Sequence, residues 1–165
     1  MRNIVLTGFM GSGKSSVGRT LGKKLGRTVV DTDELIEEKI GMKISDIFSK
    51  FGEERFREIE AEVVENVSAF DNHIIITGGG VVLNSSNIAY LRKTGVIVFL
   101  KTSPEIIYER VKNEGHRPLL DVPEPLARIK ELLEVRNTYY NDNDIEIVTD
   151  SMSVDDVAKE VITKI

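Results

Sequence analysis

Eight consecutive residues near the N-terminus, Gly8-Phe9-Met10-Gly11-Ser12-Gly13-Lys14-Ser15, have the glycine, lysine and serine spacing of the Walker A motif. An apolar run precedes them and a helix-forming stretch follows. Glycines let backbone N–H groups turn toward a phosphate, and the helix N-terminus adds positive potential. A lysine in this position neutralises the β- and γ-phosphates, and the serine after it can ligate Mg²⁺. The alternative, a glycine-rich turn before a helix, leaves the agreement of strand, loop, lysine and serine unexplained.

This motif predicts that a nucleoside triphosphate is bound by Gly11, Ser12, Gly13, Lys14, Ser15 and Ser16. A guanine-specific protein would carry an Asn/Thr-Lys-x-Asp motif after a later strand. The only comparable run, at residues 141–144, reads Asn-Asp-Asn-Asp and lacks the lysine. The sequence therefore favours ATP as the nucleotide and a kinase over a GTPase.

Two carboxylates, Asp31 and Asp33, flank Thr32 where the second expected strand ends. Ligands of α/β folds gather at this edge of a parallel sheet. One carboxylate could hold a Mg²⁺-bound water while the other accepts a proton from a hydroxyl group. Taken alone, the segment favours a simpler interpretation, in which Thr32 or Asp33 is the N-cap of a helix that starts near Leu35.

Two further features leave alternatives open. Arg57 and Glu60 are three residues apart on an expected helix, a spacing that by itself favours a weak surface ion pair. Gly78, Gly79 and Gly80 follow a buried strand. Three glycines there permit either a loose turn or a close approach of the backbone to a ligand.

The elements that must position these residues alternate between short β-branched runs and helical patterns, which predicts an α/β fold with a parallel sheet covered by helices on both faces. We expect strands at residues 3–6, 28–30, 74–76, 96–100 and 145–148. We expect helices at residues 14–25, 44–68 with a break near Gly52, 88–93, 104–112, 126–143 and 154–165. Glycine and three prolines in residues 113–125 indicate a loop long enough to be a lid.

Length and composition limit the remaining possibilities. The 165 residues suit one domain. With 22 basic and 27 acidic side chains, the net charge of −5 has the wrong sign for a nucleic-acid surface. The absence of cysteine excludes disulfides, thiolate metal sites and cysteine nucleophiles. The short N-terminal apolar run is unlike a signal peptide, and no run is long enough to span a bilayer. We expect a cytoplasmic monomer without nucleic-acid or membrane partners.

Together these residues resemble the shikimate kinases. The resemblance runs from Gly8 to Tyr140 and continues beyond the loop and the aspartate pair with Ile47-Phe48, Gly52-Glu53, Phe56-Arg57-Glu58-Ile59-Glu60, Gly78-Gly79-Gly80, Arg110, Arg117-Pro118-Leu119-Leu120, and Arg136 with Tyr140. It implies a single P-loop kinase domain over residues 1–165 of the nucleoside monophosphate kinase type. In this fold the five strands have the order 2-3-1-4-5, and we expect a substrate-binding segment at about residues 31–60 and a lid at about 113–125.

The resemblance also implies an activity and a set of roles. The enzyme would transfer the γ-phosphate of ATP to the 3-hydroxyl of shikimate, with Mg²⁺ as cofactor. The acceptor would contact Asp33, Arg57, Gly78, Gly79, Gly80 and Arg136. Asp33, Lys14 and Arg117 would be catalytic, Ser15 and Asp31 would serve the metal, and Arg110 and Arg117 would contact ATP, with Phe48 and Phe56 as walls of the acceptor site.

Two other functions stay open at this point. A gluconate kinase of the same fold would share the loop, sheet and lid. The pair Arg57 and Arg136 argues against it, because two arginines suit the carboxylate of shikimate. A non-catalytic nucleotide-binding relative would be expected to lack Lys14, Asp33 or Arg117, and all three are present.

Overall fold

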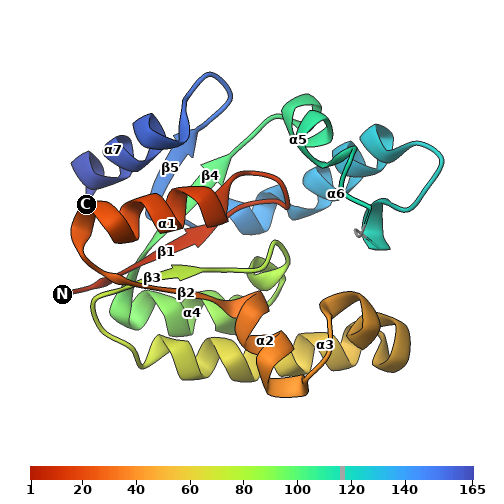
Figure 1. Ribbon diagram of the computed structural model, residues 1–165, viewed down its shortest axis with the longest axis horizontal. Helices are drawn as coiled ribbons and strands as arrows, with labels where there is room; N and C mark the ends of the chain where they lie inside the picture. The colour runs from red at the N-terminus through yellow and green to blue at the C-terminus, as the bar shows by residue number, and fades with distance from the viewer. Residues whose placement is uncertain (116–117) are drawn as a thin grey trace.

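The expected alternation of strands and helices is present in the computed structural model, which describes residues 1–115 and 118–165 (Figure 1). Five strands form one parallel sheet in the order β2-β3-β1-β4-β5. Their bounds are β1 Asn3–Thr7, β2 Thr28–Asp31, β3 His73–Ile76, β4 Gly95–Lys101 and β5 Ile145–Val148. The predicted strands and their order are confirmed, with ends that differ by one residue at most.

The described residues also form seven α-helices and two short 3-10 turns. The helices are α1 Lys14–Leu25, α2 Thr32–Ile40, α3 Ile44–Ser68, α4 Ser85–Thr94, α5 Pro104–Val111, α6 Pro125–Tyr140 and α7 Val154–Lys164, and the turns are η1 Val81–Leu83 and η2 Pro118–Leu120. Among these helices, none is both long and apolar enough to cross a bilayer.

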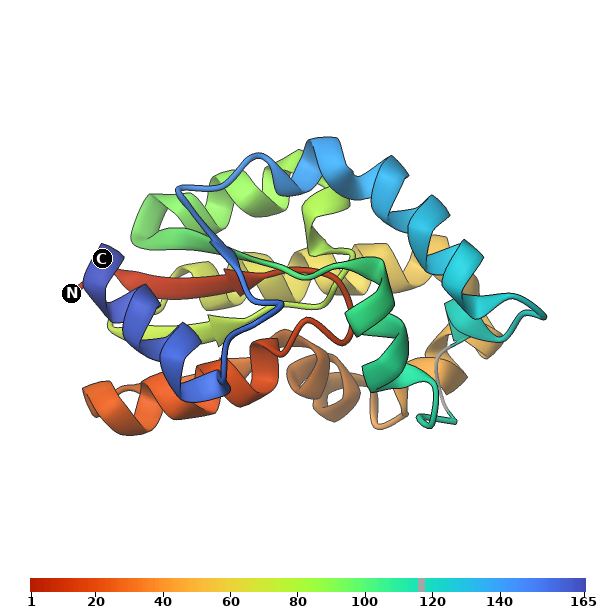
Figure 2. The same cartoon turned by 90° about the horizontal axis from the view of Figure 1, so that it is seen from above.

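The strand side chains alternate between two cores, so the helices form a layer on each face of the sheet (Figure 2). In β1, Val5 packs with residues of α3, α4 and α6, whereas Ile4 and Leu6 pack with residues of α1 and α7. This pattern explains why the strands read as continuous apolar runs: both of their faces are buried.

Local signals set most of the helix ends. In α4, the Asn84 side chain accepts a hydrogen bond from the Ser86 N–H, so the helix begins three residues before the predicted start at residue 88. At the other end of the chain, Ser153 caps α7 by accepting from the Asp156 N–H, as its spacing indicates. The predicted break in α3 is confirmed, because Gly52 has φ 83° and ψ 171°.

Helix α2 is the element that the expected set of helices omits. It begins at Thr32 rather than near Leu35, and its N-cap is Asp31, whose Oδ1 accepts a hydrogen bond from the Asp33 N–H at 2.9 Å. The expectation that Thr32 or Asp33 is the cap is therefore wrong. The helix starts as soon as β2 ends, which places both aspartates at the carboxyl edge of the sheet.

Candidate active site

The P-loop connects β1 to α1 at the carboxyl edge of the sheet, and Lys14 is the first residue of the helix. Lys14 is buried, and its Nζ donates to the carbonyl oxygens of Gly8 at 2.8 Å and Phe9 at 2.9 Å. The ammonium group is thus held over the loop by the loop's own backbone. Ser12 is also buried, and its Oγ has no hydrogen-bond partner among the described residues, whereas Ser15 and Ser16 are exposed on the first turn of α1.

The two carboxylate oxygens of Asp31 accept hydrogen bonds from two different neighbours. While Oδ1 caps α2, Oδ2 accepts a long hydrogen bond from the Ser15 hydroxyl at 3.5 Å. Burial raises the pKa of Asp31 above its ordinary value, and the hydrogen bond from the Asp33 N–H opposes that rise. The capping role and a role beside Ser15 are therefore compatible in one carboxylate. No cluster of three acidic or histidine ligands occurs in residues 1–115 and 118–165.

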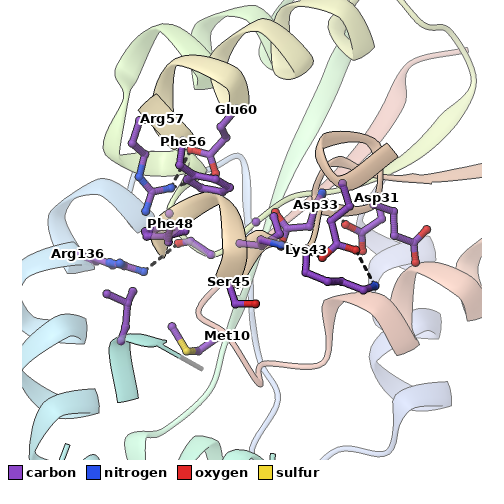
Figure 3. A pocket seen from close by; sticks show the side chains of 17 residues that line it. Met10, Asp31, Asp33, Lys43, Ser45, Phe48, Phe56, Arg57, Glu60 and Arg136 are labelled. Carbon is purple, nitrogen blue, oxygen red and sulfur yellow. Dashed lines mark hydrogen bonds and ion pairs between the residues drawn. The ribbon is translucent and has the colours of Figure 1, made fainter. Parts of the chain in front are cut away.

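A cavity of about 650 Å³ opens beside the loop, at the carboxyl ends of β2 and β3 (Figure 3). In this view Arg57 and Arg136 lie on one side, and Asp31 and Asp33 on the other. The complete lining is Met10, Asp31, Asp33, Glu34, Glu37, Lys43, Ile44, Ser45, Phe48, Phe56, Arg57, Glu60, Gly78, Gly79, Gly80, Leu119 and Arg136. The structure thus brings all the predicted acceptor-binding residues into one space.

The pair Arg57 and Glu60 is not the surface ion pair that its spacing favours. Glu60 is only 1% exposed, and both of its carboxylate oxygens accept from Arg57 Nη1, at 3.0 and 2.8 Å. Burial raises the pKa of Glu60, and the charge of Arg57 acts against this rise. The spacing alone could not reveal the burial, which arises because this part of α3 packs on the core beneath the cavity.

Two phenylalanines form an apolar wall next to this pair. The rings of Phe48 and Phe56 lie 4.5 Å apart between centroids, and the guanidinium of Arg57 lies 5.1 Å from the ring centroid of Phe56. An arginine between a buried carboxylate and an aromatic ring has little freedom to change its orientation. The wall therefore helps to fix the direction in which Arg57 faces the cavity.

On the other side of the glycine run, Gly78-Gly79-Gly80, helix α6 supplies Arg136 and Tyr140. The Tyr140 hydroxyl donates to the Gly79 carbonyl, to which Arg136 Nη1 also donates at 3.4 Å. Burial raises the pKa of Tyr140 to about 12, so the phenol remains a donor at neutral pH. In the sequence, Tyr140 is indicated only by the resemblance, and its spacing of four residues after Arg136 is the signal that places both on one helix face.

The remaining predicted site residues belong to α5 and to the expected lid. Arg110 of α5 donates from Nη1 to the Gly11 carbonyl at 3.0 Å, which brings it against the P-loop. In the expected lid, Leu119 lines the cavity and Leu120 is buried against the core. Arg117 lies outside the described residues, as does His116.

Comparison with known proteins agrees with this geometry. The family model described as shikimate kinase matches residues 10–165. A shikimate kinase of Thermodesulfovibrio yellowstonii is 50% identical over 162 residues, covering 98% of this chain and 94% of its own. One of Caldanaerobacter subterraneus is 49% identical, covering 98% and 95%.

A solved structure shows the same likeness in three dimensions. The shikimate kinase from Acinetobacter baumannii in complex with shikimate superposes with a TM-score of 0.95 at 35% identity, covering 99% of this chain and 92% of that one. Because a family match over residues 10–165, two relatives of about 50% identity and this structure agree, the chain belongs to the shikimate kinase family.

Proposed function

We propose that the cavity beside the P-loop holds shikimate. This chain would then transfer the γ-phosphate of ATP to the 3-hydroxyl of the bound shikimate, giving shikimate 3-phosphate and ADP. The observation that carries this proposal is the meeting of two arginines, Arg57 and Arg136, with Asp33 in one cavity next to the loop. Arginine recognises carboxylates through charge-assisted, partly bidentate hydrogen bonds. A small acid with several hydroxyl groups matches this set of groups.

Asp33 is the proposed base. It lies in the first turn of α2, and its carboxylate is directed at the glycine run in the cavity. In this position it would bind ring hydroxyls and accept the proton of the attacking hydroxyl. Because phosphoryl transfer depends mainly on positioning and charge neutralisation, holding the hydroxyl in line with the γ-phosphate is its larger task.

Lys14, Arg110 and Arg117 are the proposed nucleotide contacts. Lys14 would exchange its two carbonyl partners in the loop for the β- and γ-phosphates. Arg110, which already contacts the loop at Gly11, would lie against adenine. Arg117 would reach the phosphates from the lid, and Gly11 to Ser16 would supply the cradle.

The residues present fit a magnesium ion bound with the nucleotide. The Ser15 hydroxyl and the Asp31 carboxylate lie next to each other, and oxygen atoms are the ligands that Mg²⁺ prefers. Few protein ligands are needed, because bound Mg²⁺ usually keeps several waters and phosphate oxygens as ligands. When bound, the ion would neutralise phosphate charge. The role of Asp31 is to orient this region from the α2 cap, and that of Ser15 is to present its hydroxyl from the α1 N-terminus.

A coupled ADP-release assay with Mg-ATP and shikimate, quinate, gluconate or nucleoside monophosphates tests the proposal. Shikimate should be turned over, and gluconate and the nucleotides should be left largely untouched. A kcat/KM for gluconate at or above that for shikimate would transfer the assignment to a gluconate kinase. No turnover of any acceptor would identify a non-catalytic relative.

The proposal also includes a single P-loop kinase domain over residues 1–165, acting as a monomer in the cytoplasm. The substrate-binding segment at about 31–60 corresponds to α2 and the first part of α3, which carry Asp33, Phe48 and Arg57. Light scattering after gel filtration tests the monomer, and a dimer in dilute solution would contradict it.

A further inference from the structure

The three glycines after β3 do not owe their identity to backbone conformation. None of them has a positive φ, and Gly80 has φ −101° and ψ 0°. Residues with side chains are allowed in the region that Gly80 occupies, for example at position i+2 of type I turns. The reason for glycine must therefore lie in what surrounds each Cα.

A methyl group on each glycine would meet a different part of the site. On Gly80 it would overlap both terminal nitrogens of Arg57 and lie 2.6 Å from Cζ. On Gly78 it would lie 2.7 Å from Asp33 Oδ1 and 3.2 Å from Glu60 Oε1. Unstrained contacts of this kind are about 3.5–4.0 Å. Arg57 and Asp33 could therefore not keep their present positions.

The middle glycine faces the nucleotide side instead. A methyl group on Gly79 would lie 3.2 Å from the Met10 backbone nitrogen and 3.5 Å from the Gly8 carbonyl oxygen. Its neighbour is the P-loop backbone, which cannot rotate away as a side chain can.

The backbone of the run is itself fixed. The Gly78 N–H donates to the buried Thr32 hydroxyl at 3.1 Å, and the Gly79 carbonyl accepts from Tyr140 and Arg136. Added bulk at Gly78 or Gly80 must therefore be relieved by the neighbouring side chain rather than by the run.

We propose that the three glycines are separate positioning residues: Gly80 gives Arg57 its place, Gly78 gives Asp33 its place, and Gly79 sets the approach of the run to the P-loop. This inference rests on the proposed function. It predicts that three adjacent glycine-to-alanine changes alter three different kinetic parameters, although the residues are neighbours in one turn.

Gly80→Ala should raise the KM for shikimate by roughly tenfold or more, because it displaces one guanidinium from the acceptor carboxylate, while kcat changes much less. Gly78→Ala should mainly lower kcat, by roughly tenfold or more, because it displaces the base. Gly79→Ala should mainly raise the KM for ATP.

As a control, Gly26→Ala introduces strain at φ 64° in open space at the end of α1, so it should lower stability and leave all three parameters near wild type.

A double-mutant cycle gives the decisive measurement. If the methyl group at residue 80 acts only through Arg57, Gly80→Ala should change the KM for shikimate by less than about twofold in an Arg57→Ala background. If Gly80→Ala alone folds poorly, it should cause little further loss of stability in the Arg57→Ala background, because the overlap is then gone.

Two results would overturn the inference: an unreduced effect of Gly80→Ala in the Arg57→Ala background, or the same proportional change in every parameter for all three variants. Its failure is distinct from failure of the proposed function. Turnover of shikimate by the wild type and the KM of Arg57→Ala test that function independently of the glycines.

Discussion

At the scale of single residues, the site depends on charged groups that are removed from water in pairs. Glu60 is almost fully buried, and Arg57, its partner, lies between that carboxylate and an aromatic ring. An unpaired buried charge is costly, so each member of such a pair holds the other in place. In the proposed function, the acceptor is therefore recognised by a side chain whose orientation is set before the acceptor binds.

Replacing Asp33 with asparagine separates catalysis from binding. The change keeps the size of the side chain and removes the base together with a charged acceptor of hydrogen bonds. We expect kcat to fall by on the order of 10²-fold or more. Steady-state kinetics with saturating Mg-ATP measures this. A kcat near that of the wild type would show that the base is another group.

The raised pKa of Glu60 predicts how stability varies with pH. Because folding raises this pKa above the ordinary value of 4.5, the folded state holds the proton more tightly than the unfolded chain. The contribution of Glu60 to the free energy of unfolding is therefore complete below pH 4.5 and is lost as the pH rises through the folded pKa. Relative to Glu60→Gln, the wild type should become less stable over this range.

Urea unfolding of both proteins at several pH values from about 4.5 to 8 gives the difference directly. Glu62→Gln is the matched control, because its hydrogen bond to Lys39 lowers the pKa of Glu62. The contribution of that group is present above pH 4.5 and is lost only as the pH falls through its lowered folded pKa, so the difference between wild type and Glu62→Gln should stay nearly constant from pH 4.5 to about 8. A constant difference between wild type and Glu60→Gln would contradict the prediction.

At the scale of elements, apolar periodicity and punctuation predicted the sheet well, because buried parallel strands are short, β-branched and separated by turn residues. The start of α2 was expected too late, near Leu35 instead of Thr32, because β2 passes into the helix without a connecting residue and no loop signal separates them. The burial of Glu60 was missed for a different reason. A spacing of three residues shows which side chains share a helix face, but the packing of α3 on the core decides whether that face meets water.

Tyr140 links α6 to the glycine run, and its removal should loosen that link. Tyr140→Phe keeps the stacking on Phe99, whose ring centroid is 4.9 Å away, and removes the donor to the Gly79 carbonyl. We expect a loss of about 1 kcal/mol in the free energy of unfolding. The neighbouring Tyr139→Phe, at a side chain that is 43% exposed, should change stability by less than about 0.5 kcal/mol. Equal effects of the two changes in urea unfolding would contradict the role given to Tyr140.

The lid makes its contribution through Arg117, according to the family resemblance. Arg117→Ala should lower kcat by roughly 10²-fold or more, because it removes positive charge from the transferring phosphate, and should leave the Kd for shikimate nearly unchanged. Arg128→Ala on α6, which removes an arginine paired with Glu131, is the control and should keep wild-type kinetics.

Hydrogen exchange of residues 113–125 should slow with nucleotide and shikimate together. Full activity of Arg117→Ala would make this segment an ordinary surface loop.

At the scale of the whole molecule, all five strands point their carboxyl ends toward the same edge, and both proposed ligand sites lie there, while the two termini lie at the opposite end of the sheet (Figure 1). The acceptor cavity is built from α2, α3, the glycine run and α6, and the nucleotide loop from the β1–α1 connection and α5. The two sites therefore share an edge but few side chains. Each ligand should stabilise the fold through its own contacts.

Thermal unfolding with single ligands tests this separation. At a concentration of 100 times its Kd, shikimate should add about 2.7 kcal/mol to the stability of the folded state, which corresponds to a rise of roughly 5–10 °C in Tm for a chain of this length. At the same shikimate concentration Arg57→Ala should lose most of that rise, because the arginine proposed to bind the acceptor carboxylate is gone, and should keep the rise produced by Mg-ADP. Lys14→Met should show the converse, keeping the response to shikimate and losing much of the response to Mg-ADP. If either substitution removed both responses, the two sites would depend on one shared structure, and the division of the edge into an acceptor half and a nucleotide half would be wrong.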